Sequence, residues 1–83
     1  MTRNEVIDRL KEILLAADER NRPLIENCTE QSNLITDFGF SSVNMLYMVI
    51  AVEEVFQIRF DNVSVTDFET LGDVVNFIEQ KLQ

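Results

Sequence analysis

Two adjacent serines, Ser41 and Ser42, occupy the position in this chain that is best suited to chemistry. They follow Asp37 and Gly39, which are typical of a turn, and they precede an apolar stretch over residues 43–56 without glycine or proline. A helix is therefore expected to begin at the serines. A serine at a helix start is most often an N-cap, and Ser41 is suited to that role. Ser42 then presents a second hydroxyl in the first turn.

The chain offers little for catalysis of its own. It contains no histidine, so the Ser–His pair that activates a serine nucleophile cannot form. The acidic pair Glu53 and Glu54 has no histidine or cysteine cluster beside it, and residues 61–66 lack the spacing of a calcium loop. We therefore predict no enzymatic activity, no catalytic residue and no metal site.

Length and composition indicate one small domain over residues 1–83, with 46% hydrophobic residues available for a core. The first residues are polar, so no signal peptide is expected, and the longest apolar run, 45–52, is too short to span a membrane. The only cysteine, Cys28, cannot form an internal disulfide, which favours the reducing cytoplasm.

The charge of the chain is strongly acidic and unevenly distributed. Fifteen acidic and seven basic residues give a net charge of −8, which disfavours nucleic acid as a partner. Residues 37–83 carry eight of the acidic and only two of the basic side chains, so the acidic field lies on the half that contains the serines. This field would steer partner proteins with basic patches, although solubility alone also accounts for it.

Local patterns predict three main helices. The first begins at a capping box formed by Thr2 and Glu5, and the last begins at a similar cap formed by Thr70 and Asp73. The helix over 42–56 is apolar around most of its circumference and cannot be buried on every side in so small a domain. Part of one face should therefore stay at the surface, unless the long loop before it covers that face. That face comprises Val43, Leu46, Tyr47 and Ile50.

The connections between these helices are less clear from residue patterns. Residues 18–41 form a long loop that contains Pro23, the only proline, and a short helical turn over 23–27 is possible. Residues 57–66 are rich in β-formers, and Ile58 and Phe60 alternate as in a strand, so strand and loop both remain open.

Three segments resemble the acyl and peptidyl carrier proteins. Asp37-Phe-Gly-Phe-Ser-Ser-Val43 is similar to the attachment motif Asp-Leu-Gly-x-Asp-Ser-Leu of that family. Ala51-Val-Glu-Glu-Val-Phe56 is similar to the end of the family's second helix, and Phe68-Glu-Thr-Leu71 is similar to the start of its last helix. The resemblance implies an all-α four-helix bundle of acyl-carrier type, with three principal helices, one short third helix near residues 65–68 and a long first loop. It also implies that the segment 57–66 is a loop, with Ile58 and Phe60 in the core.

The resemblance further implies a function as a free-standing, monomeric acyl carrier protein. A 4′-phosphopantetheine arm from coenzyme A would be attached covalently to Ser42 by a phosphopantetheinyl transferase, which supplies the base and Mg²⁺. The thiol of the arm would then carry intermediates as thioesters. The expected partners are acyl-loading and acyl-processing enzymes with basic docking patches. The expected contact residues are Val43, Leu46, Tyr47, Ile50, Glu53 and Glu54.

The chain departs from the family pattern at three positions. Carriers of primary fatty acid synthesis usually have acidic residues at the start of the second helix, where this chain has Ser41, Asn44 and Tyr47. This difference favours a dedicated pathway of polyketide, peptide or modified-lipid synthesis over bulk fatty acid synthesis. Two alternatives remain open: an aminoacyl or peptidyl carrier protein, and an acidic helical adaptor that keeps the carrier fold without the arm.

Overall fold

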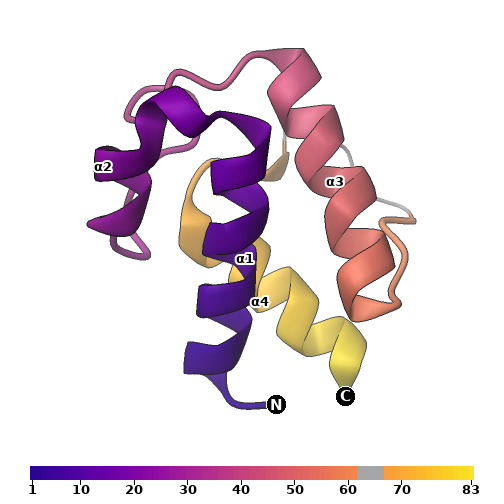
Figure 1. Ribbon diagram of the computed structural model, residues 1–83. Helices are drawn as coiled ribbons and strands as arrows, with labels where there is room; N and C mark the ends of the chain where they lie inside the picture. The colour runs from indigo at the N-terminus through magenta and orange to yellow at the C-terminus, as the bar shows by residue number, and fades with distance from the viewer. Residues whose placement is uncertain (62–66) are drawn as a thin grey trace.

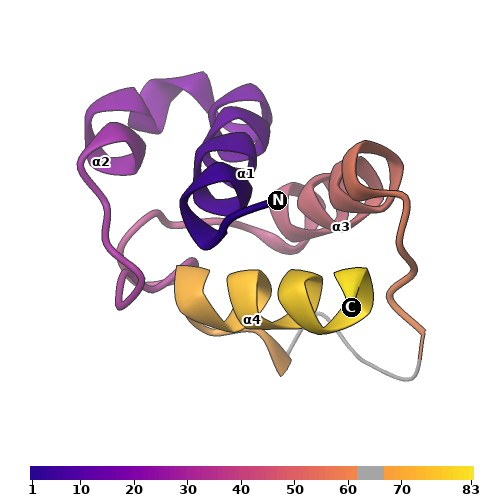
Figure 2. The ribbon, with the colours of Figure 1, turned by 90° about the horizontal axis from the view of Figure 1, so that it is seen from below.

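The computed structural model describes residues 1–61 and 67–83, which form a helical bundle (Figure 1). Its elements in chain order are α1 (Arg3–Ala17), the 3₁₀ turn η1 (Glu19–Asn21), α2 (Arg22–Glu26), α3 (Ser42–Phe56) and α4 (Leu71–Leu82). Helix α1 packs against α2, α3 and α4. Figure 2 shows α4 lying along one side of the bundle, below both α1 and α3 in this view. The all-α architecture of acyl-carrier type is confirmed.

The helix starts agree with the capping signals in the sequence. Thr2 and Glu5 form the predicted reciprocal capping box of α1, and Thr70 and Asp73 form that of α4. Helix α3 spans residues 42–56, as its uninterrupted apolar stretch predicts, and it ends at Gln57 in the left-handed conformation (φ 56°). The possible helical turn near Pro23 is the short helix α2, with the proline in its first turn.

One apolar face of each main helix forms the core. The buried residues are spaced three or four positions apart, as expected for helices that pack on one side. On α1 they are Val6, Leu10, Ile13 and Leu14; on α3 they are Met45, Met48, Val52 and Phe56; on α4 they are Leu71, Val74, Val75 and Ile78. None of the helices within the described ranges is long and apolar enough to cross a membrane.

The segment after α3 is a loop up to residue 61, as the resemblance implied. Ile58 is buried, and the half-buried Phe60 stacks on Phe77 with ring centroids 4.5 Å apart. Phe68 packs edge-on against both of these rings. The first half of the short third helix expected near residues 65–68, residues 65 and 66, lies outside the described residues.

The long first loop is anchored to the start of α4 by backbone hydrogen bonds. The Leu34 N–H donates to the Glu69 carbonyl at 2.8 Å, and the Leu71 N–H donates to the Ser32 carbonyl at 3.0 Å. Gly72 allows a close approach here, because a Cβ atom at this position would lie 3.0 Å from the Glu30 carbonyl oxygen. These bonds leave the loop ordered and bring Glu30 towards the ends of α1 and α4.

Arg3 joins three parts of the fold through ion pairs with Glu30 in the loop and Glu79 on α4. The hydrogen bond from Arg3 lowers the pKa of Glu30. A carboxyl group with a lowered folded-state pKa stabilises the fold above its unfolded pKa, and this contribution is lost as the pH falls through the folded pKa. Stability should therefore decrease from about pH 5 downwards.

Arg3→Gln should make this acid destabilisation shallower, because the Glu30 pKa would return towards its ordinary value. The melting temperature measured between about pH 7 and pH 3 tests this expectation. Arg9→Gln, an exposed substitution on the same helix, is the matched control. Parallel pH curves for wild type and Arg3→Gln would contradict the prediction. Some pH dependence should remain in both, because hydrogen bonds also lower the pKa of Glu5, Asp61 and Asp73.

Candidate functional site

Ser41 is the N-cap of α3, with extended backbone angles (φ −84°, ψ 174°). Its hydroxyl accepts the Asn44 N–H at 3.3 Å and donates to Asn44 Oδ1 at 2.9 Å. Its own N–H donates to the same oxygen at 3.0 Å. The capping role expected for Ser41 is confirmed, and its hydroxyl is fully occupied within the capping box.

Ser42 is the first residue of α3 and is exposed to solvent. Among the described residues, its hydroxyl has no hydrogen-bond partner within the protein, unlike that of Ser41. The first turn of α3 contains no acidic side chain, so the positive end of the helix dipole is not neutralised there. A phosphate ester on this hydroxyl would lie beside first-turn amides that lack intrahelical partners. The position therefore fits a covalently attached phosphate group both sterically and electrostatically.

The turn before the serines is anchored by two buried phenylalanines. Phe38 and Phe40 are 4% and 3% exposed, and their rings lie 5.8 Å apart. Gly39 between them has a φ of 70°, a left-handed conformation that glycine adopts without a steric penalty. The Asp37 carboxylate accepts the Asn33 N–H at 2.6 Å and closes the preceding turn. These residues set the place at which the chain enters α3.

An exposed apolar stripe runs along α3 from the serines. It comprises Val43, Leu46, Tyr47 and Ile50, which are 75%, 55%, 46% and 50% exposed. The spacing of three and four residues places them on one face of the helix. The alternative that the long loop covers this face is wrong, because the loop packs instead towards α2 and the start of α4.

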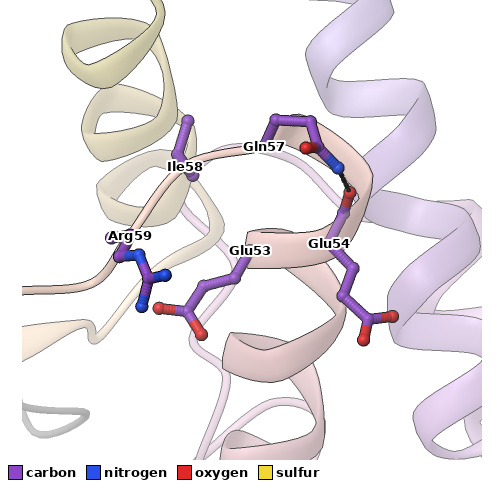
Figure 3. Close-up of a pocket in the computed structure, with 5 residues that line it drawn as sticks. All are labelled: Glu53, Glu54, Gln57, Ile58 and Arg59. Atoms are coloured by element: carbon purple, nitrogen blue, oxygen red, sulfur yellow. Dashed lines mark hydrogen bonds between the residues drawn. The ribbon is translucent and has the colours of Figure 1, made fainter.

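The acidic residues of α3 lie at its far end, around a shallow cleft of about 380 Å³ lined by Glu53, Glu54, Gln57, Ile58 and Arg59 (Figure 3). Glu53 is half-buried, and its carboxylate accepts the Phe60 N–H at 2.9 Å. Glu54 is exposed, and Figure 3 shows its carboxylate pointing away from that of Glu53. The two glutamates are therefore not equivalent: Glu53 stabilises the loop after α3, whereas the Glu54 carboxylate has no hydrogen-bond partner among the described residues.

Two asparagines at this site have a role that the sequence patterns did not reveal. Asn44 and Asn21 each make a hydrogen bond to a backbone carbonyl far away in the chain. Cys28 is half-buried, and burial raises the pKa of its thiol, which disfavours the reactive thiolate form. The residues that the structure describes contain no cluster of acidic, cysteine or histidine side chains that could hold a metal ion.

The structure thus places an exposed serine hydroxyl at a helix start, beside an exposed apolar stripe, and the described residues offer no histidine base next to it. This arrangement is expected of a class of domains that other proteins modify and recognise. Comparison with known proteins agrees with this class. The family described as "phosphopantetheine attachment site" matches residues 5–78. The acyl carrier protein of Thermotoga maritima is 31% identical over 98% of this chain and 96% of its own length. The acyl carrier protein of Phenylobacterium zucineum is 29% identical over 95% of this chain and 96% of its own.

The chain therefore belongs to the acyl carrier protein family, whose members hold a covalently attached 4′-phosphopantetheine prosthetic group. The acyl carrier protein of Caulobacter vibrioides, 28% identical over 94% of this chain and 96% of its own length, is a further relative.

Proposed function

We propose that this protein carries thioester-bound intermediates on a 4′-phosphopantetheine arm attached to Ser42. Ser42 is preferred to Ser41 because the two hydroxyls differ in their hydrogen bonds. Ser41 Oγ is held in the capping box, whereas Ser42 Oγ is exposed and has no partner among the described residues. Attachment at Ser42 would leave the cap of α3 intact, whereas attachment at Ser41 would break it.

The attachment chemistry requires little from the carrier itself. Ser42 Oγ forms a phosphodiester bond to the phosphopantetheine phosphorus of coenzyme A, and the bond to the adenosine bisphosphate leaving group breaks. The hydroxyl proton passes to a base on the transferase, because this chain has no histidine to accept it. When bound, the arm supplies a thiol that holds acyl groups as thioesters. Tethering gives each docked enzyme a high effective concentration of the intermediate.

The apolar stripe of α3 is proposed as the surface that these enzymes recognise. Val43, Leu46, Tyr47 and Ile50 continue directly from the attachment residue, and Glu54 follows on the same face of the helix. Exposed apolar stripes with a polar border are typical of protein interfaces. The transferase and the acyl-loading enzymes would thus meet a neutral surface beside the arm and an acidic one at the far end.

This charge pattern favours a dedicated biosynthetic pathway. The first three turns of α3 contain no acidic residue, and Glu54 lies about 18 Å along the helix from Ser42. Enzymes that rely on acidic contacts next to the serine would bind this surface poorly. A polyketide, peptide or modified-lipid pathway in the cytoplasm, with its own partner enzymes, is the proposed setting.

The neutral helix start also supports a second candidate, an aminoacyl or peptidyl carrier protein. Loading assays separate the two. An acyl carrier should accept an acyl group from acyl-transferring enzymes, and an aminoacyl carrier should accept an amino acid from adenylating enzymes. The adaptor without an arm is tested more simply, because it would gain no mass when the apo protein is incubated with coenzyme A, Mg²⁺ and a broad-specificity transferase.

Glu54→Lys should weaken the binding of partner enzymes through the change of charge alone. At low salt the KM of a partner for the holo protein should rise on the order of threefold, and the effect should fade at high salt. Glu12→Lys, the same change on an exposed position of α1, is the matched control and should have little effect. Equal KM values for the two variants would show that Glu54 is not part of the docking surface.

Glu53→Lys should behave differently from Glu54→Lys. It removes the acceptor of the Phe60 N–H, so it should lower the stability of the fold by about 1 kcal/mol in addition to any effect on partners. Thermal unfolding measures this difference. An unchanged melting temperature would show that the Glu53–Phe60 contact contributes nothing to stability.

A further inference from the structure

The side chain of Asn44 connects the start of α3 to the end of α1. Its Oδ1 accepts two hydrogen bonds from Ser41, one from the N–H at 3.0 Å and one from the hydroxyl at 2.9 Å. Its Nδ2 donates to the carbonyl oxygen of Ala17 at 3.1 Å. Ala17 is the last residue of α1, where carbonyl groups have no partner within the helix. A single amide group therefore caps one helix and joins it to another.

A second asparagine holds the same region from the other side. Asn21, in the turn after α1, donates from Nδ2 to Asp18 Oδ2 at 3.1 Å and also to the carbonyl oxygen of Phe38. Phe38 lies just before the serines, and Asn44 lies just after them. The segment that presents Ser42 is thus fixed on both sides to the corner formed by residues 17–21, where the end of α1 meets the start of α3 (Figure 1).

We infer that Asn44 is a positioning residue for attachment of the arm: its bond to Ala17 fixes the first turn of α3 and hence the place from which the Ser42 side chain projects. This inference rests on the proposed function of Ser42. An attacking oxygen that is held in place avoids the loss of rate that follows from a small misplacement.

The chemistry of Asn44 allows its role in the capping box of α3 to be separated from its role in the bridge to Ala17. Aspartate at this position would keep an oxygen that accepts the Ser41 hydrogen bonds, so the cap would remain. It would have no N–H to donate, and a carboxylate oxygen would then face the carbonyl oxygen of Ala17. Asn44→Asp therefore breaks the bridge to α1 and leaves the capping box in place. Asn76→Asp, on an exposed position of α4, makes the same chemical change far from the serine along the chain.

Steady-state transfer of phosphopantetheine to the apo protein tests the inference. Asn44→Asp should lower kcat by about tenfold, with KM changed by less than about twofold, at both low and high salt. Asn76→Asp should match wild type in both parameters. A kcat for Asn44→Asp within about twofold of wild type would overturn the inference, as would a change confined to KM that disappears at high salt, because that is the behaviour of added charge. If wild type itself gains no arm, the proposed function fails instead.

Nuclear magnetic resonance of the wild-type apo protein tests the bridge without any variant. The side-chain amide protons of Asn44 should exchange with solvent more slowly than those of the exposed Asn76, because one of them is held by Ala17. Equal exchange rates for the two side chains would overturn the inference. This measurement keeps the test decisive even if Asn44→Asp does not fold.

Discussion

Replacing Ser42 by alanine should abolish attachment of the arm. Incubated with coenzyme A, Mg²⁺ and a broad-specificity transferase, the wild-type apo protein should gain the mass of one phosphopantetheine, and Ser42→Ala should gain none. The fold should be unaffected, because the Ser42 hydroxyl makes no hydrogen bond among the described residues and the cap of α3 belongs to Ser41. Intact mass and thermal unfolding, measured together, check both parts of this expectation.

Ser41→Ala is the matched control and should give the reverse result. It should still accept the arm, but loss of the N-cap should cost about 1 kcal/mol of stability. For a domain of this size that corresponds to a fall in melting temperature of about 4–8 °C. A mass gain in Ser42→Ala together with none in Ser41→Ala would show that the arm is attached to Ser41. No gain in any protein, with a known carrier modified in parallel, would favour the adaptor without an arm.

Leu46→Asp should cause the second large effect, on the enzymes that dock with the protein. Leu46 lies in the middle of the exposed stripe of α3, with Val43 on one side and Ile50 on the other. A carboxylate there would have to be buried without a partner in a complex that covers the stripe. We expect the KM of the transferase and of acyl-loading enzymes to rise by about tenfold or more, the range seen for central interface residues. Steady-state kinetics with each enzyme measure it.

Leu24→Asp provides a closely matched control for this experiment. Leu24 is 54% exposed, compared with 55% for Leu46, but it lies on α2, away from the stripe. It should change KM by less than about twofold, because the same substitution then falls outside the interface. Equal effects of the two substitutions would show that docking does not distinguish the α3 surface from the rest of the protein.

The start and the bounds of α3 were predictable from the sequence because their signals are local. The capping boxes at Thr2 and Thr70 depend only on residues three positions apart, and the structure confirms both. The bounds of α3 follow from a serine cap and an uninterrupted apolar stretch that ends at Phe56. The roles of the two serines follow from the same register: one residue caps the helix, and the next lies in its first turn.

Other features could not be predicted because they join residues that are distant in the chain. Asn44 and Ala17 are 27 positions apart, and only the packing of α3 against α1 brings the amide to the carbonyl. Glu53 and Glu54 look equivalent in the sequence, and only the return of the loop after α3 gives one of them the Phe60 N–H. The same holds for the long first loop, whose bonds to the start of α4 keep it away from the apolar stripe.

The sequence by itself thus determined where the helices begin, which of their faces are apolar, and which serine lies in the first turn of α3. These properties depend on the spacing of neighbouring residues and on the hydrogen-bonding capacity of single side chains. The tertiary structure alone decided that the long loop leaves the apolar face of α3 exposed, which glutamate has no side-chain partner among the described residues, and what fixes the turn that presents Ser42. Those properties depend on which surfaces the other helices cover, and that follows from the packing of the whole chain.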